Sequence, residues 1–459
     1  MLKSATNFSP VVSIMSDQRR PLAYIWRNMR ALMLHYRLHQ SDPWLERFVV
    51  WSAAALSALI IVGFVRLTDI ALHTYAHIYH HFFILSLLLP PAGGMLIATL
   101  MRLGFRGAEG SGIPQVIACL REDHPAPADR LISLPVVVGK IILGSAAMAA
   151  GFSTGREGPC VQIGAAMMYW MRRWLPVRNH ISAHELILAG GAAGIAAAFN
   201  TPLAGIIFAI EELTRRFEPR TQRVLLTAIV IAGMVSISLQ GNYLYFGHLH
   251  IQHLSTAVII PVLMAALVCG IAGGLFSRTL LWSGVKVLPA LNDLRKQHTV
   301  LFAGLCGLAI SLLSLLSHGS VQGSGYDVTH AMLMEGHPVA WYYAPFKVMA
   351  TALSFHSGVP GGIFAPSLAI GAGIGQDLLL MMGSPSTHGI MYALGMAGFL
   401  AAVTQSPITS TIIVMEMIDG HELVISLVAV SLLASLVSRG FTPSLYHRLS
   451  ERYESPTDQ

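Results

Sequence analysis

Gly155-Arg156-Glu157-Gly158-Pro159 places two charged side chains next to each other inside an otherwise apolar stretch of the chain. An apolar run at 134–151 precedes this pentapeptide. Glycine lets the backbone adopt positive φ and approach a ligand closely, and proline fits the first turn of a helix. The stretch therefore predicts a loop that delivers a helix N-terminus, and Glu157 with it, into apolar surroundings.

The composition of the whole chain predicts that its main solvent is lipid. Hydrophobic residues make up 54% of the 459 residues, and charged residues make up only 11%. A soluble domain carries about 25% charged residues, so this chain has too little polar material for a water-facing surface. Apolar runs recur at 49–65, 82–98, 134–151, 186–210, 224–239, 258–276, 301–316, 390–403 and 423–437.

These runs predict helices and not a β-barrel. Their apolar residues do not alternate with period two, as barrel strands do. A lipid-embedded helix satisfies its own backbone, but several runs are shorter than the roughly 20 residues of a full span. We therefore expect an all-α polytopic membrane protein in which some helices are tilted or broken.

An internal repeat relates two stretches about 205 residues apart. Residues 201–211 and 406–416 both begin with a hydroxyl residue and proline, continue as an apolar run and end in glutamate. Upstream, 158–164 resembles 365–371 at nearly the same offset. Duplicated membrane halves commonly build a substrate site from broken helices at their interface. The residues alone leave open whether the halves are parallel or inverted.

Two further Gly/Pro clusters resemble the first in character. They are Gly110-Ser111-Gly112-Ile113-Pro114 and the segment 358–366, and a weaker cluster occupies 443–446. A helix N-terminus carries about half a positive charge and unpaired N–H groups, so it can bind an anion without a full countercharge. Three such loops predict an anion pathway, because a buried Lys or Arg would hold the ion too tightly for transport.

Glu157 is the first candidate for chemistry, because an ionisable residue inside the membrane is costly and is usually functional. A carboxylate beside helix N-termini can compete with an anion for one site and leave on protonation. Its alternative role is a simple salt bridge to Arg156. Glu211 and Glu212 end an apolar run and can be an ordinary helix end. Adjacent helical residues point about 100° apart, so the two need not share a role.

The three ordered motifs resemble the signatures of the chloride channel/transporter (CLC) family, between about Val50 and Tyr446. The resemblance implies two inverted repeats in each subunit and a homodimer with one pathway per subunit. It implies chloride ligands at Ser111 and Tyr446, with backbone N–H groups near Gly112, Gly158, Ile363 and Phe364 completing the sites. Tyr446 has the weakest local match. No organic cofactor or metal is implied, and chloride is the substrate.

The resemblance also implies how protons move. Glu157 is similar to the family's external gating glutamate, and Lys140 is similar to its buried lysine. Glu212, not Glu211, matches the internal proton-transfer glutamate, which favours a chloride/proton antiporter over a passive voltage- or pH-gated channel. Ser111 resembles the chloride-selective type and not the nitrate or fluoride branches. His356 departs from the family pattern, either as a packed histidine or as a source of pH sensitivity.

Basic clusters such as Arg19/Arg20 and Arg215/Arg216 are typical of cytoplasmic loops, not of a nucleic-acid-binding surface. The apolar runs predict a multi-pass membrane protein, and the short stretch after Tyr446, with no room for a regulatory domain, favours a bacterial inner membrane. The predicted parts of the protein are a cytoplasmic segment 1–48 with an amphipathic helix over 24–38, transmembrane repeats at 49–250 and 251–446, and a cytoplasmic tail 447–459.

Other functions find little support in the sequence. The four cysteines show no metal or disulfide spacing, and the histidine groups at 73–81 and 248–253 lack an HExxH pattern. An intramembrane hydrolase would need base partners for Ser111 that the sequence does not supply. A receptor or scaffold would not need three Gly/Pro loops. We therefore expect a transporter and not an enzyme.

Overall fold

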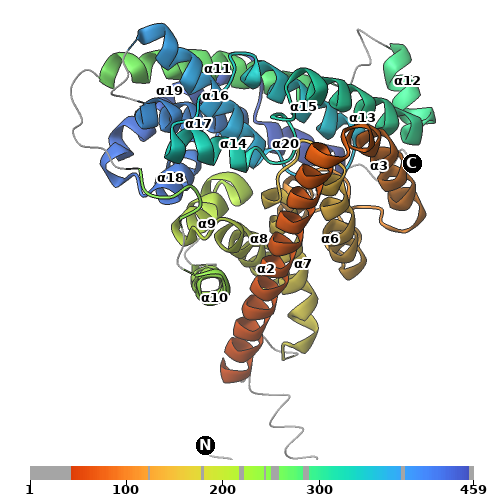
Figure 1. Cartoon of the computed structure of the whole chain (residues 1–459). Coiled ribbons are helices and arrows are strands. Elements are labelled where there is room, and N and C mark those ends of the chain that lie inside the picture. Colours follow the sequence, from red (N-terminus) through yellow and green to blue (C-terminus); the bar gives the residue numbers. More distant parts are fainter. Residues whose placement is uncertain are drawn as a thin grey trace, which may run out of the picture. The chain divides into compact units, whose positions relative to one another are not determined.

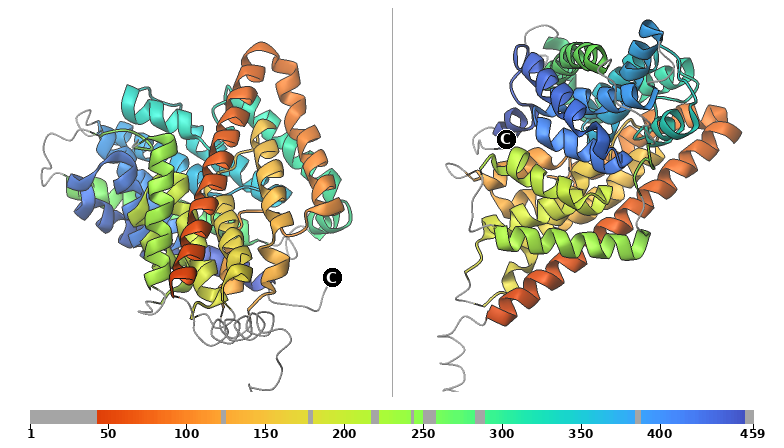
Figure 2. Two further views of the ribbon diagram at one scale, coloured as in Figure 1. Left: turned by 90° about the horizontal axis from the view of Figure 1, so that it is seen from below. Right: turned by 90° about the vertical axis from the view of Figure 1, so that its left-hand side faces the viewer.

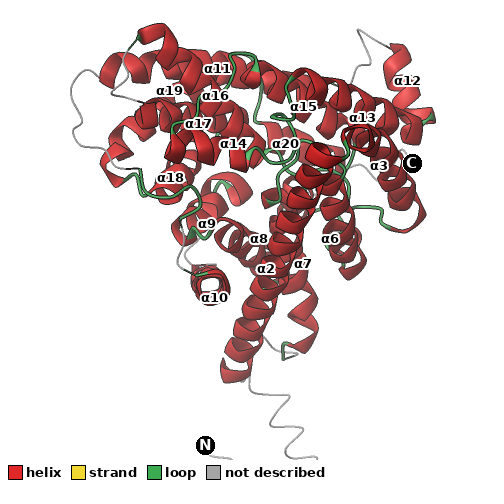
Figure 3. Cartoon of the chain, in the orientation of Figure 1, coloured by secondary structure: helices red, strands yellow, loops and turns green. Residues whose placement is uncertain are grey.

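The computed structural model describes residues 43–121, 125–176, 180–216, 222–241, 244–249, 258–282, 289–383 and 388–453. This part of the chain is mostly helical, with no strand drawn (Figure 3). One isolated β-bridge joins Gly155 and Gly362. The predicted amphipathic helix over 24–38 lies outside the described residues. The all-α prediction is confirmed for the residues that are described.

The described residues form the following helices. In chain order they are α2 (Pro43–His81), α3 (Phe83–Gly104), α4 (Ile113–Leu120), α5 (Ala128–Leu131), α6 (Leu134–Ala149), α7 (Glu157–Met171), η1 (Arg172–Trp174), α8 (Ala183–Phe199), α9 (Pro202–Phe208), η2 (Ala209–Thr214), α10 (Gln222–Gln240), α11 (Ile259–Leu281), α12 (Pro289–Gln297), α13 (Thr299–Leu316), α14 (Tyr326–His330), η4 (Ala331–Glu335), α15 (Tyr343–Ser357), α16 (Phe364–Met382), α17 (His388–Thr404), α18 (Pro407–Ile418), η6 (His421–Leu423), α19 (Val424–Arg439), α20 (Leu445–Ser450) and η7 (Glu451–Tyr453).

Among the described residues, eight helices are long and apolar enough to cross a bilayer. The run predicted at 49–65 belongs to a longer helix, because α2 continues to His81. The run predicted at 186–210 is not one helix. Asn200 takes a left-handed conformation (φ 58°) that ends α8, and Pro202 then starts α9. Broken helices of this kind were expected from the short apolar runs.

The described residues fall into two compact units. The smaller consists of 43–49, 174–176 and 180, and the larger of the remaining described residues between 50 and 453. Within the first unit, His180 Nδ1 lies 3.5 Å from a carboxylate oxygen of Glu46. All the features discussed below belong to the second unit. The predicted boundary between the repeats at 250/251 lies outside the described residues, so the repeat boundaries stay a prediction.

The two repeats build equivalent helix pairs within the second unit. α7 packs along α8 in the first repeat, and α16 packs along α17 in the second. At the corresponding crossings, a Cβ on Gly164 would overlap Gly190 O, and a Cβ on Gly371 would overlap Gly395 O. Small residues let membrane helices approach this closely. α6–α9 and α16–α19 form separate groups (Figures 1 and 2), as duplicated halves predict.

Candidate functional site

The three Gly/Pro motifs meet through backbone hydrogen bonds. Gly155 N donates to Gly362 O at 2.7 Å, and Gly362 N donates back to Gly155 O at 2.6 Å. Gly361 N donates to Gly110 O at 3.0 Å. The two most distant of these loops, at Gly110 and Gly361, are about 250 residues apart in the chain. The N-termini of α4, α7 and α16 are thereby brought to one place inside the protein.

Glycine is required where these loops approach one another. Gly112 caps the N-terminus of α4 with φ 102°, a left-handed conformation that favours glycine. A Cβ on Gly158 would overlap the Ser111 hydroxyl, and a Cβ on Gly362 would lie 3.0 Å from Gly158 N. The structure therefore brings Ser111, Gly112 and Gly158 together.

Tyr446 reaches the same place from the other end of the chain. It lies in α20, which packs against α4, and its ring stacks on the Phe364 ring with centroids 5.9 Å apart. The phenol faces the Ser111 hydroxyl and lies near the carboxylates of Glu157 and Glu212. Phe364 begins α16, and Ile363 is its buried N-cap residue. Tyr446, which had the weakest match in sequence, thus lies beside the other predicted ligands.

Several polar atoms in this cluster are buried and make no hydrogen bond of standard geometry. Among the described residues they are Ser111 Oγ, Tyr446 Oη and both carboxylate oxygens of Glu157, although the two hydroxyls face each other and the carboxylate faces the backbone N–H groups of Arg156, Glu157 and Ala365. An unsatisfied buried polar group costs about 1–3 kcal/mol, so each such group needs an explanation. Two hydroxyl donors beside helix N-termini can bind a small anion, and a protonated Glu157 can donate as well.

Glu157 is the first residue of α7 and is fully buried. Its carboxylate lies against Gly155, where a Cβ would overlap one of the carboxylate oxygens. The same Cβ would lie 3.3 Å from Ala365 N in the first turn of α16. The side chain is therefore located between the N-termini of α7 and α16. A carboxylate there occupies a position that also suits an anion.

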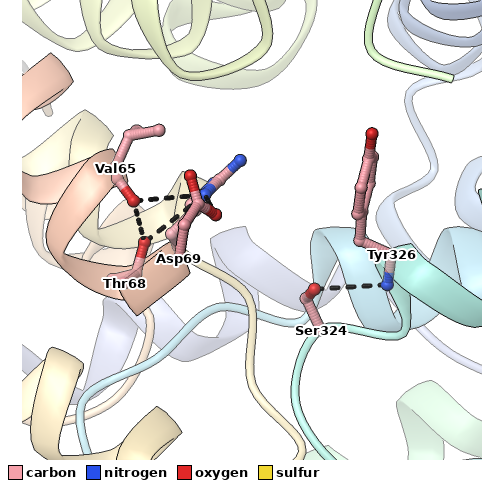
Figure 4. Close-up of polar contacts among 6 residues, drawn as sticks. Val65, Thr68, Asp69, Ser324 and Tyr326 are labelled. Atoms are coloured by element: carbon pink, nitrogen blue, oxygen red, sulfur yellow. Dashed lines mark hydrogen bonds and ion pairs between the residues drawn. The ribbon is translucent and has the colours of Figure 1, made fainter. Parts of the chain in front are cut away.

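Arg156 is anchored to α2. Its guanidinium pairs with the Asp69 carboxylate and lies 3.3 Å from Val65 O and 3.4 Å from Thr68 Oγ1. Figure 4 shows Val65, Thr68 and Asp69 converging from one turn of α2. Ser324 and Tyr326, drawn in the same view, line a cavity with Asp69 and Arg156. Sequence reasoning missed Asp69, because no local pattern pairs residues 87 positions apart.

Lys140 is fully buried and holds the loop before Ser111. Its ammonium donates to Ala108 O at 2.9 Å, Glu109 O at 3.2 Å and Gly110 O at 2.6 Å. Lys347 is buried in the same way and donates to Val321 O, Gln322 O and Gly323 O. Three carbonyls satisfy all three donors of each ammonium. Lys140 thus positions the α4 loop and does not contact the Ser111 hydroxyl.

Glu211 and Glu212 have different surroundings, as their angular separation predicted. Both lie in η2, a π-helical segment, and such segments often occur at functional sites. Glu211 accepts hydrogen bonds from Ile408 N and Thr409 N at the start of α18. Glu212 is fully buried and accepts a hydrogen bond from Ser406 Oγ. Its other oxygen, Oε1, has no hydrogen-bond partner in the described chain.

His447 is a neighbour of Glu212 that the sequence did not reveal. Its Nδ1 lies 3.8 Å from Glu212 Oε1, and its side chain is 22% exposed. It directly follows Tyr446, so adjacency to that residue was the only available signal. The pair connects a buried carboxylate to a partly exposed imidazole that can carry a proton.

The remaining candidates fall outside this cluster. His356 Nε2 donates to Thr279 O at 3.0 Å, which supports a packed histidine. His250 and His253 lie outside the described residues, and the described residues contain no group of three metal-binding side chains. All four cysteines are buried and free.

Known proteins resemble this chain in sequence and in fold. Residues 93–439 match the family described as voltage gated chloride channel. The chain is 31% identical over 375 residues to the H(+)/Cl(−) exchange transporter ClcA of Yersinia pestis bv. Antiqua (strain Angola), covering 78% of this chain and 74% of the relative.

Two solved structures share the fold. A slow cyanobacterial Cl−/H+ antiporter superposes with a TM-score of 0.79 at 23% identity, covering 92% of this chain and all of that one. A CLC-type fluoride/proton antiporter superposes with a TM-score of 0.73 at 24% identity, covering 88% of this chain and 97% of that one. The CLC-type all-α fold is confirmed. This multi-pass membrane protein is a transporter and not an enzyme, and it belongs to the CLC family of voltage gated chloride channels and their exchanger relatives.

Proposed function

We propose that this protein is a chloride/proton antiporter, in which chloride and the Glu157 carboxylate compete for one site. Chloride binds between the hydroxyls of Ser111 and Tyr446 and the backbone N–H groups of Gly112, Gly158, Ile363 and Phe364. Protonation of Glu157 removes its charge and lets the side chain leave. Protons are then carried as chloride moves in the opposite direction.

The observation that carries this proposal is a pair of buried hydroxyls that face each other. Ser111 Oγ and Tyr446 Oη make no hydrogen bond of standard geometry, although both belong to side chains that are almost completely buried. The helix N-termini beside them supply partial positive charge without a titrating cation. Neutral donors of this kind bind an anion and still allow its release.

The proton pathway runs between Glu157 and Glu212. Glu212 is buried, accepts a hydrogen bond from Ser406 Oγ and faces the partly exposed His447. Protons can therefore reach Glu212 from the side of α20. Tyr446 lies within electrostatic range of both glutamates. An aliphatic residue at 212 would leave the chloride path intact but remove this carrier, as in a passive channel. The buried carboxylate therefore favours exchange.

The anion proposed is chloride, although a fluoride/proton antiporter also shares the fold. Ser111 and Tyr446 each offer one hydroxyl donor in a site lined otherwise by backbone and aromatic rings. The curated relative named above is a chloride exchanger. We also propose a homodimer in a bacterial inner membrane, which rests on the family resemblance.

The test is reconstitution of the purified protein into liposomes with an outward chloride gradient and no initial pH difference. Exchange predicts that protons move into the vesicles against a growing gradient while chloride leaves. An impermeant pH dye inside the vesicles and a chloride electrode outside measure both fluxes. Chloride efflux without any proton movement would identify a passive channel and contradict the proposal.

A further inference from the structure

A second polar cavity lies at the end of α11, and its lining contains none of the proposed chloride ligands. Its volume is about 750 Å³, and its lining includes the arginines Arg278, Arg448 and Arg452 together with Trp282 and Phe441. None of these residues takes part in the proposed exchange. Arg278 lies in the last turn of α11, and Arg452 lies in η7, just after α20.

The cavity carries excess positive charge. Glu451 is the only acidic residue among its described lining residues, and it pairs with Arg448. Arg452 donates to Leu281 O at 3.2 Å, a neutral carbonyl that does not balance its charge. Burial, and then the nearby Arg452 charge, lower the pKa of Arg295 in α12. Several cations therefore gather here with one carboxylate between them.

The surroundings of these arginines match the membrane surface. α11 is one of the eight candidate spans, so its end at Leu281 marks the edge of the apolar layer. Trp282 directly follows it and is 40% exposed, and Phe441 is 42% exposed. Tryptophan is typical of the interface between lipid and water. The lining thus combines exposed aromatic rings with guanidinium groups at headgroup depth.

We propose that this cavity binds a phosphate group, either in the headgroup of an anionic phospholipid or in a soluble phosphate compound. Guanidinium groups bind phosphate oxygens in pairs of hydrogen bonds, so Arg278 and Arg452 are the proposed ligands. Basic pockets between the ends of membrane helices recognise lipid headgroups in this way. The inference does not depend on the proposed exchange activity.

The test compares the full-length protein in phosphatidylcholine nanodiscs with and without a minor fraction of phosphatidylglycerol. Native mass spectrometry counts the retained phosphatidylglycerol, and thermal unfolding measures its stabilising effect. The double variant Arg278→Gln/Arg452→Gln should bind phosphatidylglycerol at least about tenfold more weakly, because it loses the charge-assisted hydrogen bonds of two guanidinium groups to phosphate. Arg102→Gln/Arg106→Gln is the matched control, since it removes two exposed arginines outside the cavity.

A second experiment distinguishes a lipid headgroup from a soluble phosphate as the ligand. Inorganic phosphate is added to nanodiscs of phosphatidylcholine alone. If it raises the unfolding temperature of the wild type but not of the double variant, the ligand is a soluble phosphate. If only phosphatidylglycerol does so, the ligand is a lipid headgroup. Equal responses of wild type and double variant to both probes, or an equal loss in the control variant, overturn the proposal.

A conservative variant keeps the test decisive if the double variant does not fold. Arg278→Lys retains the charge but loses the planar fork that binds two phosphate oxygens. It should fold and bind phosphatidylglycerol several-fold more weakly than the wild type. Unchanged binding in Arg278→Lys would contradict recognition of phosphate by this arginine.

Discussion

Glu211 and Glu416 exchange equivalent contacts between the two repeats. Glu211 in η2 accepts hydrogen bonds from Ile408 N at 3.1 Å and Thr409 N at 2.6 Å. Glu416, the equivalent residue of the second repeat, accepts hydrogen bonds from Leu203 N at 3.3 Å and Ala204 N at 2.8 Å. When two elements are related by a two-fold axis, equivalent residues make the same contact in both directions. Each glutamate thus caps the broken helix of the other repeat.

The reciprocal caps predict matched losses of stability. Glu211→Gln and Glu416→Gln should each lower the free energy of unfolding by about 1 kcal/mol, because a glutamine offers one neutral acceptor where two charged oxygens accepted hydrogen bonds. Thermal unfolding in detergent measures the effect, with the exposed Glu422→Gln as control. A large loss in one cap variant and none in the other would contradict the two-fold relation.

Glu157→Ala should separate chloride flux from proton flux. Removing the carboxylate leaves Ser111, Tyr446 and the helix N-termini in place, so chloride should still cross the membrane. Proton movement driven by a chloride gradient should fall to the level of protein-free vesicles. Proton pumping that persists in this variant would reject Glu157 as the proton carrier.

Glu212→Ala should abolish proton transport while chloride flux continues. Glu211→Ala is the matched control, because that adjacent residue caps α18 and does not face His447. The control should be less stable but should keep the ratio of proton to chloride flux. If both variants change this ratio equally, or if Glu212→Ala leaves it unchanged, the assignment of Glu212 is wrong.

Tyr446→Phe and Ser111→Ala should weaken chloride binding. Each removes one hydrogen bond to a charged ligand, a contribution of about 1.5–3 kcal/mol, so the dissociation constant should rise at least about tenfold. Calorimetric titration of chloride into the purified protein measures the change. Phe302→Leu, at a core position outside the site, serves as the packing control. An unchanged dissociation constant in both hydroxyl variants would exclude these groups as ligands.

The two buried lysines should differ in function although they resemble each other in structure. Lys140→Met and Lys347→Met both leave three backbone carbonyls without their donor, so both should lower the unfolding temperature. Only Lys140 holds the loop that ends at Ser111, so only Lys140→Met should also weaken chloride binding. Equal effects of the two variants on chloride affinity would show that neither lysine positions the site specifically.

Much of this site is predictable because its parts are local motifs. The Gly/Pro loops carry Ser111, Glu157 and Phe364, and the repeat at 201–211 and 406–416 anticipates the equivalent halves. The partners of these residues are not predictable in the same way. Asp69 is paired with Arg156 by the packing of α2 on the loop before α7, and His447 faces Glu212 only after α20 has packed on α4. A single sequence does not encode such long-range contacts in any spacing.

The central claim is that a halide occupies the space between Ser111, Tyr446 and the N-termini of α7 and α16. Crystals grown with bromide in place of chloride test it directly, because the anomalous signal of bromide locates the ion. The account predicts an anomalous peak within hydrogen-bond reach of Ser111 Oγ and Tyr446 Oη. Well-ordered crystals whose anomalous map lacks density there, with bromide bound only elsewhere, would contradict it.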